Sequence, residues 1–222
     1  MKTLLTIVVL LTGTITHADP MPPPFLPYVI KTPEGAHLYR EDANTLRFSG
    51  KYTEGLTSYM SMEYFKKPYQ VLKVTGSPGG LLGEAIEMSQ FINDKDILIH
   101  VTPEALCISA CSYTVIWAED RVVEGTLAFH PPYMRSIPPG ATFFSLFQQG
   151  YLTYTQVIRL SMDAGVPLYF MELVAQQSDP FTYVVIYGEG LDVLHASHIL
   201  DEEPEEFKRY YWIKTAEELK EK

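Results

Sequence analysis

The sequence predicts an α/β fold, because strand-like and helical patterns alternate along its middle. The run 71–75 is rich in β-branched residues, as expected of a buried strand, and apolar residues recur at helical spacing over 82–91. A second strand-like run at 97–101 and a second helical pattern at 109–118 repeat this order. Strands and helices in such an order favour right-handed crossover connections and a largely parallel sheet.

The chain before this core predicts an extended arm, short strands and one helix. Five prolines in 19–27 favour an extended arm. Strand-like pieces follow at 28–30, 37–40 and 45–49. Apolar residues at helical spacing then predict a helix over 53–67, which Pro68 ends.

The chain after the core is expected to become mostly helical. The further elements expected, in chain order, are strands at 121–123 and 126–129, helices at 141–149, 153–164 and 167–177, a strand at 181–187, a short helix at 191–195 and a strand at 210–213. The Thr215-x-x-Glu218 pattern is a capping box and predicts a final exposed helix.

The first 18 residues have the pattern of a secretory signal peptide. Lys2 precedes an apolar stretch over 4–11, and small residues before Ala18 fit a cleavage site. The apolar stretch is shorter than the roughly 20 residues that span a bilayer. We therefore expect cleavage after Ala18 and export to the periplasm or the medium. An ordinary buried first helix is the alternative.

The formal net charge of −10 limits the partners that the protein can have. Nucleic acids and anionic membrane surfaces attract clusters of lysine and arginine, and the sequence contains no such cluster. We expect no nucleic-acid partner, and no integral membrane segment after signal cleavage. The 222 residues, 46% of them hydrophobic, suffice for one domain with a real core.

Three short motifs carry groups suited to nucleophilic catalysis. The Gly79-Gly80 turn can offer backbone N–H groups without interference from a Cβ, Ser109 can attack a carbonyl, and His130 can accept its proton. Each motif is expected at a strand end or a helix start, where reactive groups gather in α/β folds. The N–H groups of Gly80 and Ala110 are the candidate oxyanion donors. Together these groups predict a serine hydrolase, although each one singly favours a structural role.

The two cysteines, Cys107 and Cys111, lie on either side of Ser109. Their i,i+4 spacing permits a disulfide, and its small loop would fix the serine segment while adding little to global stability. Two buried free thiols are the alternative. We expect no metal site, because two cysteines fall short of four ligands and His195 with His198 would form only half of one.

The stretch 48–132 resembles the Clp protease proteolytic subunit and its ClpP/crotonase relatives, especially exported ClpP-like bacterial proteins. The resemblance is carried by Ser77-Pro78-Gly79-Gly80, by Ser109-Ala110 within a Cys-x-Ser-Ala-Cys segment, and by Phe129-His130-Pro131-Pro132. It implies a ClpP/crotonase-like spiral of β-β-α units with a helical C-terminal handle. The domain would then span 28–200, followed by a charged tail over 201–222.

The resemblance also assigns roles to residues. It implies Ser109 as nucleophile, His130 as base, Gly80 and Ala110 as the oxyanion hole, and Gly79 as part of the substrate-binding turn. It places the third catalytic member at an aspartate after the handle: Asp179 fits best, with Asp163 and Asp192 as alternatives. The segment after Ser109 departs from the Ser-Met-Gly-Ala-like pattern of Clp subunits. An exported protein has no evident unfoldase, so ATP dependence is not carried over.

A serine–lysine dyad, as in the exported signal-peptide peptidases, is the competing mechanism. The sequence has no lysine from 96 through 207, so only Lys51 or Lys73 could fold back to serve. The sequence therefore favours histidine as the base.

The function predicted from the sequence is that of an exported, ATP-independent serine endopeptidase that works through an acyl-enzyme and needs no cofactor. Its substrates would be peptides or proteins. The resemblance implies a homo-oligomer that self-associates through 143–164. A catalytically silent binding or assembly module of the same fold is the alternative. Acyl-thioester chemistry would need a CoA pocket, of which the sequence gives no specific sign.

Overall fold

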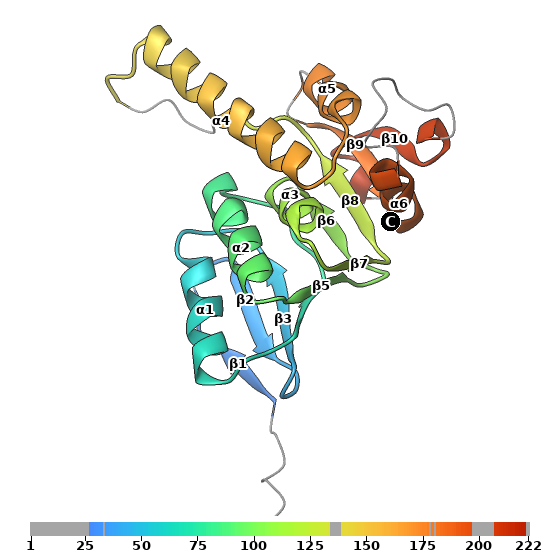
Figure 1. Ribbon diagram of the computed structural model, residues 1–222. Coiled ribbons are helices and arrows are strands. Elements are labelled where there is room, and N and C mark those ends of the chain that lie inside the picture. Colours follow the sequence, from blue (N-terminus) through green and yellow to red (C-terminus); the bar gives the residue numbers. More distant parts are fainter. Residues whose placement is uncertain are drawn as a thin grey trace, which may run out of the picture.

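Two β-sheets form the body of the protein, seen here in a computed structural model that describes residues 27–32, 34–133, 139–177, 179, 181–196 and 207–220 (Figure 1). The six-stranded sheet has the order β1 (Tyr28–Ile30), β2 (Ala36–Arg40), β3 (Thr45–Gly50), β4 (Val71–Val74), β5 (Leu98–Val101) and β7 (Arg121–Val123). The four-stranded sheet has the order β10 (Tyr211–Thr215), β9 (Thr182–Tyr187), β8 (Thr126–Phe129) and β6 (Leu106–Ile108).

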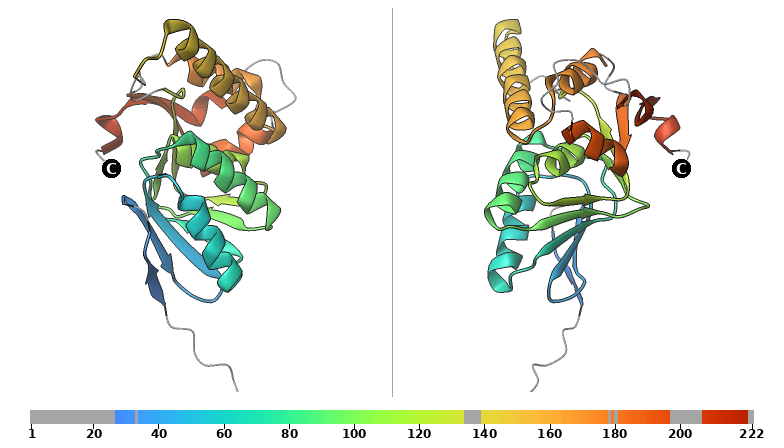
Figure 2. Two further views of the ribbon diagram at one scale, coloured as in Figure 1. Left: turned by 90° about the vertical axis from the view of Figure 1, so that its left-hand side faces the viewer. Right: turned by 45° about the vertical axis from the view of Figure 1, so that its right-hand side comes forward.

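The helices flank these sheets. They are α1 (Leu56–Lys66), α2 (Leu82–Asp94), α3 (Ala110–Trp117), α4 (Phe143–Asp163), α5 (Leu168–Gln176) and α6 (Gly188–Ala196), with 3₁₀ turns η1 (Phe207–Arg209) and η2 (Glu218–Lys220). The longest of them is α4. The first two helices lie side by side against one face of the six-stranded sheet (Figure 2).

From β5 to β8, successive strands of the chain belong alternately to the larger and the smaller sheet. β5 and β7 pair in parallel in the larger sheet, while β6 and β8, which follow them in the chain, pair in parallel in the smaller one. Along the chain, α3 follows β5 and β6, and α4 follows β7 and β8, so each of these helices ends one β-β-α unit. The expected spiral of β-β-α units with a helical handle is therefore confirmed.

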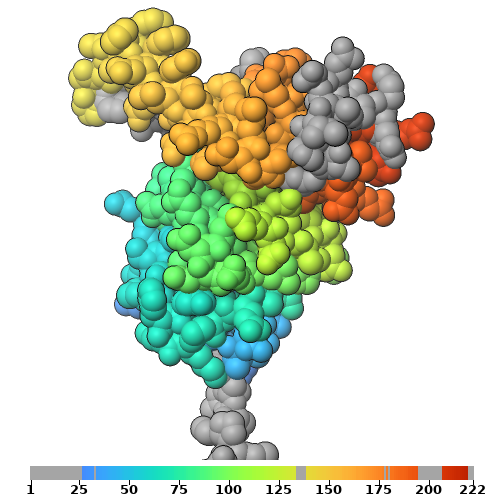
Figure 3. Space-filling model, viewed as in Figure 1, coloured from blue at the N-terminus to red at the C-terminus, as the bar shows by residue number. Residues whose placement is uncertain are grey.

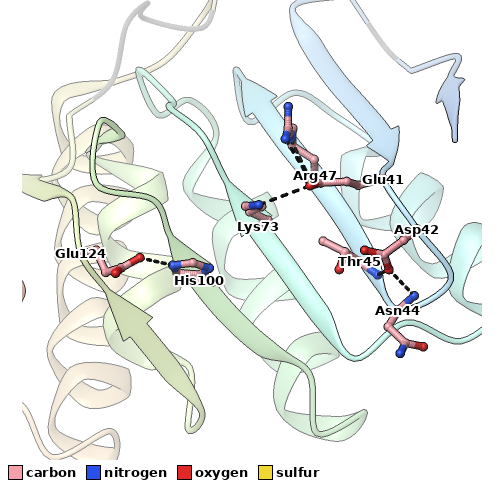
Figure 4. A network of polar contacts seen from close by, with 8 residues as sticks. All are labelled: Glu41, Asp42, Asn44, Thr45, Arg47, Lys73, His100 and Glu124. Atoms are coloured by element: carbon pink, nitrogen blue, oxygen red, sulfur yellow. Dashed lines mark hydrogen bonds and ion pairs between the residues drawn. The ribbon is translucent and has the colours of Figure 1, made fainter.

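The six-stranded sheet has one apolar and one polar face. In β4, Leu72 and Val74 are fully buried, while Lys73 between them points to the other face, as the period of two in a strand requires. Arg47, Lys73 and His100 are cross-strand neighbours on this polar face. The ion pairs of Arg47 and Lys73 with Glu41 and the hydrogen bond between His100 and Glu124 lie on the side away from the helices (Figure 4). Such partly exposed pairs contribute little to stability.

Helix α4 is anchored at one end only. Its C-terminal half packs on the body, where Val157 and Ser161 are buried and the indole N–H of Trp117 donates to the Ser161 hydroxyl at 3.0 Å. Its N-terminal half stands away from the body (Figures 1 and 3). Within the described residues, no helix combines the length and the apolar character needed to cross a membrane.

Three features of the structure differ from the sequence expectations. Helix α4 runs without interruption through Gly150, because one glycine costs a 21-residue helix only about 1 kcal/mol. The strand β6 directly before Ser109 was not predicted, and its place in the sheet comes from pairing with β8 and with Ser77.

The folded domain also extends past residue 200, because β10 pairs with β9 over five residues. The capping box between Thr215 and Glu218 is confirmed, with the Thr215 N–H donating to the Glu218 carboxylate at 2.7 Å. The expected signal peptide and most of the arm lie outside the described residues.

Candidate active site

Ser109 occupies a sharp turn between a strand and a helix. It follows β6 and is the N-cap of α3, with φ 56° and ψ −119°. Asp96 is the other residue with a Cβ and a positive φ among the described residues. A positive φ is unfavourable for a residue with a Cβ, so the surrounding structure must impose it. A nucleophilic serine on such a strand–turn–helix is the arrangement known as a nucleophile elbow.

The glycine turn packs directly against this elbow. Ser77 pairs with β6, where its N–H donates to the Leu106 carbonyl and its own carbonyl accepts from the Ile108 N–H, both at 2.9 Å. Gly79 has φ +81°, and a Cβ there would lie 2.8 Å from the Cβ of Ser109. Only glycine therefore allows the turn to approach the serine this closely.

Two backbone N–H groups beside Ser109 are available to a ligand. Hydrogen bonds join the Tyr52 N–H to the Gly79 carbonyl and the Leu81 N–H to the Tyr52 carbonyl, which fixes the backbone on both sides of Gly80. Among the hydrogen bonds between described residues, the N–H groups of Gly80 and Ala110 donate to no acceptor. Ala110 is the first residue of α3, where such unpaired donors are normal. These are the two donors expected of an oxyanion hole.

His130 directly follows β8 and is 5% exposed. Its Nδ1 lies 2.8 Å from the Pro131 carbonyl oxygen. Because a carbonyl oxygen only accepts, this contact places a hydrogen on Nδ1 and leaves Nε2 as the basic nitrogen. The Tyr113 hydroxyl donates to the His130 carbonyl at 3.0 Å and so fixes the backbone of the histidine from α3. Burial raises the pKa of Tyr113, which keeps the hydroxyl a donor.

Two tyrosine rings enclose the imidazole. The rings of Tyr133 and Tyr183 lie 5.1 and 5.2 Å from the His130 ring, between centroids. Burial, with Tyr133 and Asp179 nearby, raises the pKa of Tyr183, so this phenol stays neutral. The base therefore lies in an aromatic environment with limited access to water.

A single cavity of about 640 Å³ is lined by Gly80, Ser109 and His130 together. Its other walls come from the loop 51–54, from Leu81 and Leu82, from Tyr183 and from Gln149 of α4. The structure thus joins the three motifs that lie apart in the sequence. Gly79 and Ala110 adjoin the same point, because a Cβ on Gly79 would lie 3.2 Å from the Ala110 nitrogen.

Asp179 is not joined to this group. It is exposed, and its carboxylate accepts from the Phe181 N–H at 2.9 Å and from the Thr182 hydroxyl at 3.3 Å, within its own turn. Among the described hydrogen bonds, none connects Asp179 with His130. Neither alternative forms a described hydrogen bond with His130. Asp163 lies 3.8 Å from Arg159 at the end of α4, and Asp192 is an exposed residue of α6.

The disulfide between Cys107 and Cys111 is formed, with 5.3 Å between the two Cα atoms. The described residues contain no group of three or more His, Cys, Asp or Glu placed to hold a metal ion. The side chain of His195 and all of His198 lie outside the described part of the chain.

The two lysines considered for a dyad have different positions. Lys73 lies 3.4 Å from Glu41 on the polar sheet face. Lys51 is exposed and lines the cavity, with its aliphatic stem against Gly35.

Sequence reasoning missed a residue that connects β6, before Ser109, with β8, before His130. The buried Ser112 hydroxyl lies 2.6 Å from the Cys107 carbonyl oxygen in β6, and it accepts from the Ala128 N–H in β8 at 3.1 Å. It therefore joins the strand that leads to Ser109 with the strand that leads to His130. A serine in a small-residue segment gives no signal of this role, because its partners are main-chain groups.

Comparisons with known proteins identify no family for this chain. No protein-family model matches the chain, and no curated protein matches it. Among solved structures, one similar chain is a mutant of the 1510-N membrane-bound stomatin-specific protease. It is 12% identical, with a TM-score of 0.49, and the match covers 67% of this chain and 74% of that one. Proteins this distant can share an arrangement of strands and helices while differing in chemistry.

Proposed function

We propose that the protein is a serine hydrolase that cleaves peptide bonds, with Ser109 as nucleophile and His130 as general base. The observation that carries this proposal is the elbow at Ser109, which has a positive φ and lines the same cavity as His130. Beside it are two backbone N–H groups that donate no hydrogen bond among the described residues. An unfavourable backbone at the one serine that the sequence singles out favours a functional role over a structural one.

In the proposed reaction the Ser109 hydroxyl oxygen attacks the carbonyl carbon of the substrate, and Nε2 of His130 takes its proton. The N–H groups of Gly80 and Ala110 bind the oxyanion of the tetrahedral intermediate. The imidazolium then protonates the departing amine, which leaves an acyl-enzyme on Ser109. A water molecule, deprotonated by His130, hydrolyses this ester and restores the serine.

We assign the orientation of the imidazole to the Pro131 carbonyl, which accepts from Nδ1. Asp179 is not carried into the proposal, since both of its carboxylate oxygens already accept hydrogen bonds within its turn. No cofactor and no ATP enter this mechanism.

We further propose that the protein acts after export and as a homo-oligomer. The signal-like N-terminus supports export. Helix α4 supports self-association: its residues 143–158 carry no charge in a chain of net charge −10, and Phe143 and Phe147 are 86% and 63% exposed. Two copies of the same acidic protein repel least where they meet through an uncharged surface.

A serine-reactive phosphonate probe tests the proposal through its rate of covalent labelling. We expect the wild type to be labelled, Ser109→Ala to be unlabelled, and His130→Ala to be labelled about 10²–10⁴-fold more slowly, the contribution typical of a general base. Lys51→Met should keep its labelling rate within a few-fold. Loss of labelling in Lys51→Met but not in His130→Ala would make the lysine the base. A folded wild type that is never labelled would support the silent binding module instead.

A further inference from the structure

The disulfide spans the turn that carries the nucleophile. Cys107 lies in β6, Cys111 is the second residue of α3, and Ser109 is midway between them. Four residues of extended chain would separate the two Cα atoms by about 13 Å. The observed 5.3 Å therefore shows that the chain folds back between the two cysteines, and in this structure it does so at Ser109, between β6 and α3. Both cysteines are fully buried.

The turn needs such a constraint because of the backbone of Ser109. Its φ of 56° brings the Cβ against the chain, and a strand–helix junction without constraints would relax to a negative φ. Hydrogen bonds hold the turn on both sides: the Ser109 N–H donates to the Ala128 carbonyl at 2.8 Å, and the Ser109 carbonyl accepts from the Tyr113 N–H at 3.0 Å. The Ser112 hydroxyl of α3 also donates to the Cys107 carbonyl of β6 at 2.6 Å. The disulfide adds a covalent link between the same strand and helix.

We propose that the Cys107–Cys111 disulfide is a positioning device that holds Ser109 in its reactive backbone conformation, so that the nucleophile works only while this bond is intact. The reactivity half of this inference rests on the proposed function, whereas the conformational half does not. Both cysteines act through Ser109 and touch no substrate.

Reduction would act locally. A dithiol reductant would supply two electrons and two protons, cleave the S–S bond to two thiols, and itself become a disulfide. Because the sulfurs are buried, this requires the turn to open transiently. A disulfide that closes so short a loop adds little to global stability. The protein should therefore stay folded when reduced while its serine becomes less reactive, and an oxidising compartment would keep it active.

A comparison of protein stabilities tests whether the disulfide holds residue 109 at a positive φ, and it needs no measurement of activity. Ser109→Gly and Ser109→Ala differ in that glycine adopts a positive φ freely and alanine does not. Their unfolding equilibria would be measured with the disulfide intact and again in the Cys107→Ala/Cys111→Ala background.

The measured quantity is the unfolding equilibrium constant of Ser109→Ala divided by that of Ser109→Gly. We expect this ratio to be about fivefold larger with the disulfide intact than without it. An equal preference in both backgrounds would overturn the inference. If the double alanine variant does not fold, the same pair is compared in chains with both cysteines, with and without a dithiol reductant.

Phosphonate labelling tests the reactivity half in the wild-type chain. We expect reduction to slow labelling about tenfold or more, and reoxidation to restore it, with little change in the unfolding midpoint. Unchanged labelling of protein whose two thiols are shown to be free would overturn the inference. If the oxidised wild type is not labelled at all, the proposed function fails, and the glycine–alanine comparison still decides the positioning role.

Discussion

The contact between the glycine turn and the elbow predicts a large effect of one added methyl group. In Gly79→Ala the new Cβ would lie 2.6 Å from the Ile108 carbonyl oxygen and 2.8 Å from the Cβ of Ser109, and the residue would keep φ +81°. A positive φ costs a residue with a Cβ about 1–2 kcal/mol, and overpacking costs about 1–3 kcal/mol, so we expect a loss of about 2–5 kcal/mol.

Gly83→Ala is the matched control, four residues away. Gly83 lies in the first turn of α2, and a Cβ there would meet no atom within 4 Å. Alanine is favoured over glycine in a helix, so this variant should gain about 0.5 kcal/mol. Urea unfolding followed by tryptophan fluorescence measures both free energies, and phosphonate labelling measures the nucleophile. Equal stability and equal labelling of the two variants would refute the close packing of the turn on Ser109.

Three further predictions concern the base, its support and the handle. Asp179→Asn should change the labelling rate less than about threefold, because asparagine can keep the turn and Pro131 orients the imidazole; a loss near 10⁴-fold, as for a triad aspartate, would restore Asp179 to the mechanism. Tyr113→Phe removes the hydrogen bond to the His130 carbonyl and should lower the unfolding free energy by about 1 kcal/mol and slow labelling, while an unchanged urea midpoint would contradict that role. Phe147→Ser should shift sedimentation toward the monomer, whereas Phe65→Ser should not, because Phe65 is a similarly exposed phenylalanine on a different helix, α1. A wild type that sediments as a monomer would contradict self-association.

Short local motifs allowed the elements around the site to be predicted from the sequence. The alternation of Leu72 and Val74 with Lys73 defines a strand, and the Gly79-Gly80 turn after it marks a position that only glycine can occupy. Ser109 was recognisable at the start of a helical pattern, and His130 because it follows a strand-like run. Each of these signals lies within a few neighbouring residues.

The features that the sequence did not reveal depend on main-chain groups and on packing. Ser112 forms hydrogen bonds to main-chain groups of two different strands. Every residue has a main-chain carbonyl, so the sequence does not show which one a serine will contact. The Pro131 carbonyl is invisible for the same reason. The third catalytic position was expected at Asp179 by resemblance alone, and its carboxylate is used by its own turn. The continuity of α4 through Gly150 was missed because packing at its C-terminal half outweighs a local propensity.

The central claim is that Ser109 is the nucleophile of an assembled site. Tandem mass spectrometry of the phosphonate-treated, disulfide-intact protein locates the adduct directly. We predict one adduct, on the Ser109 hydroxyl, in the peptide that contains Cys107 and Cys111. An adduct on another residue, or none on folded protein at saturating probe, would contradict the claim.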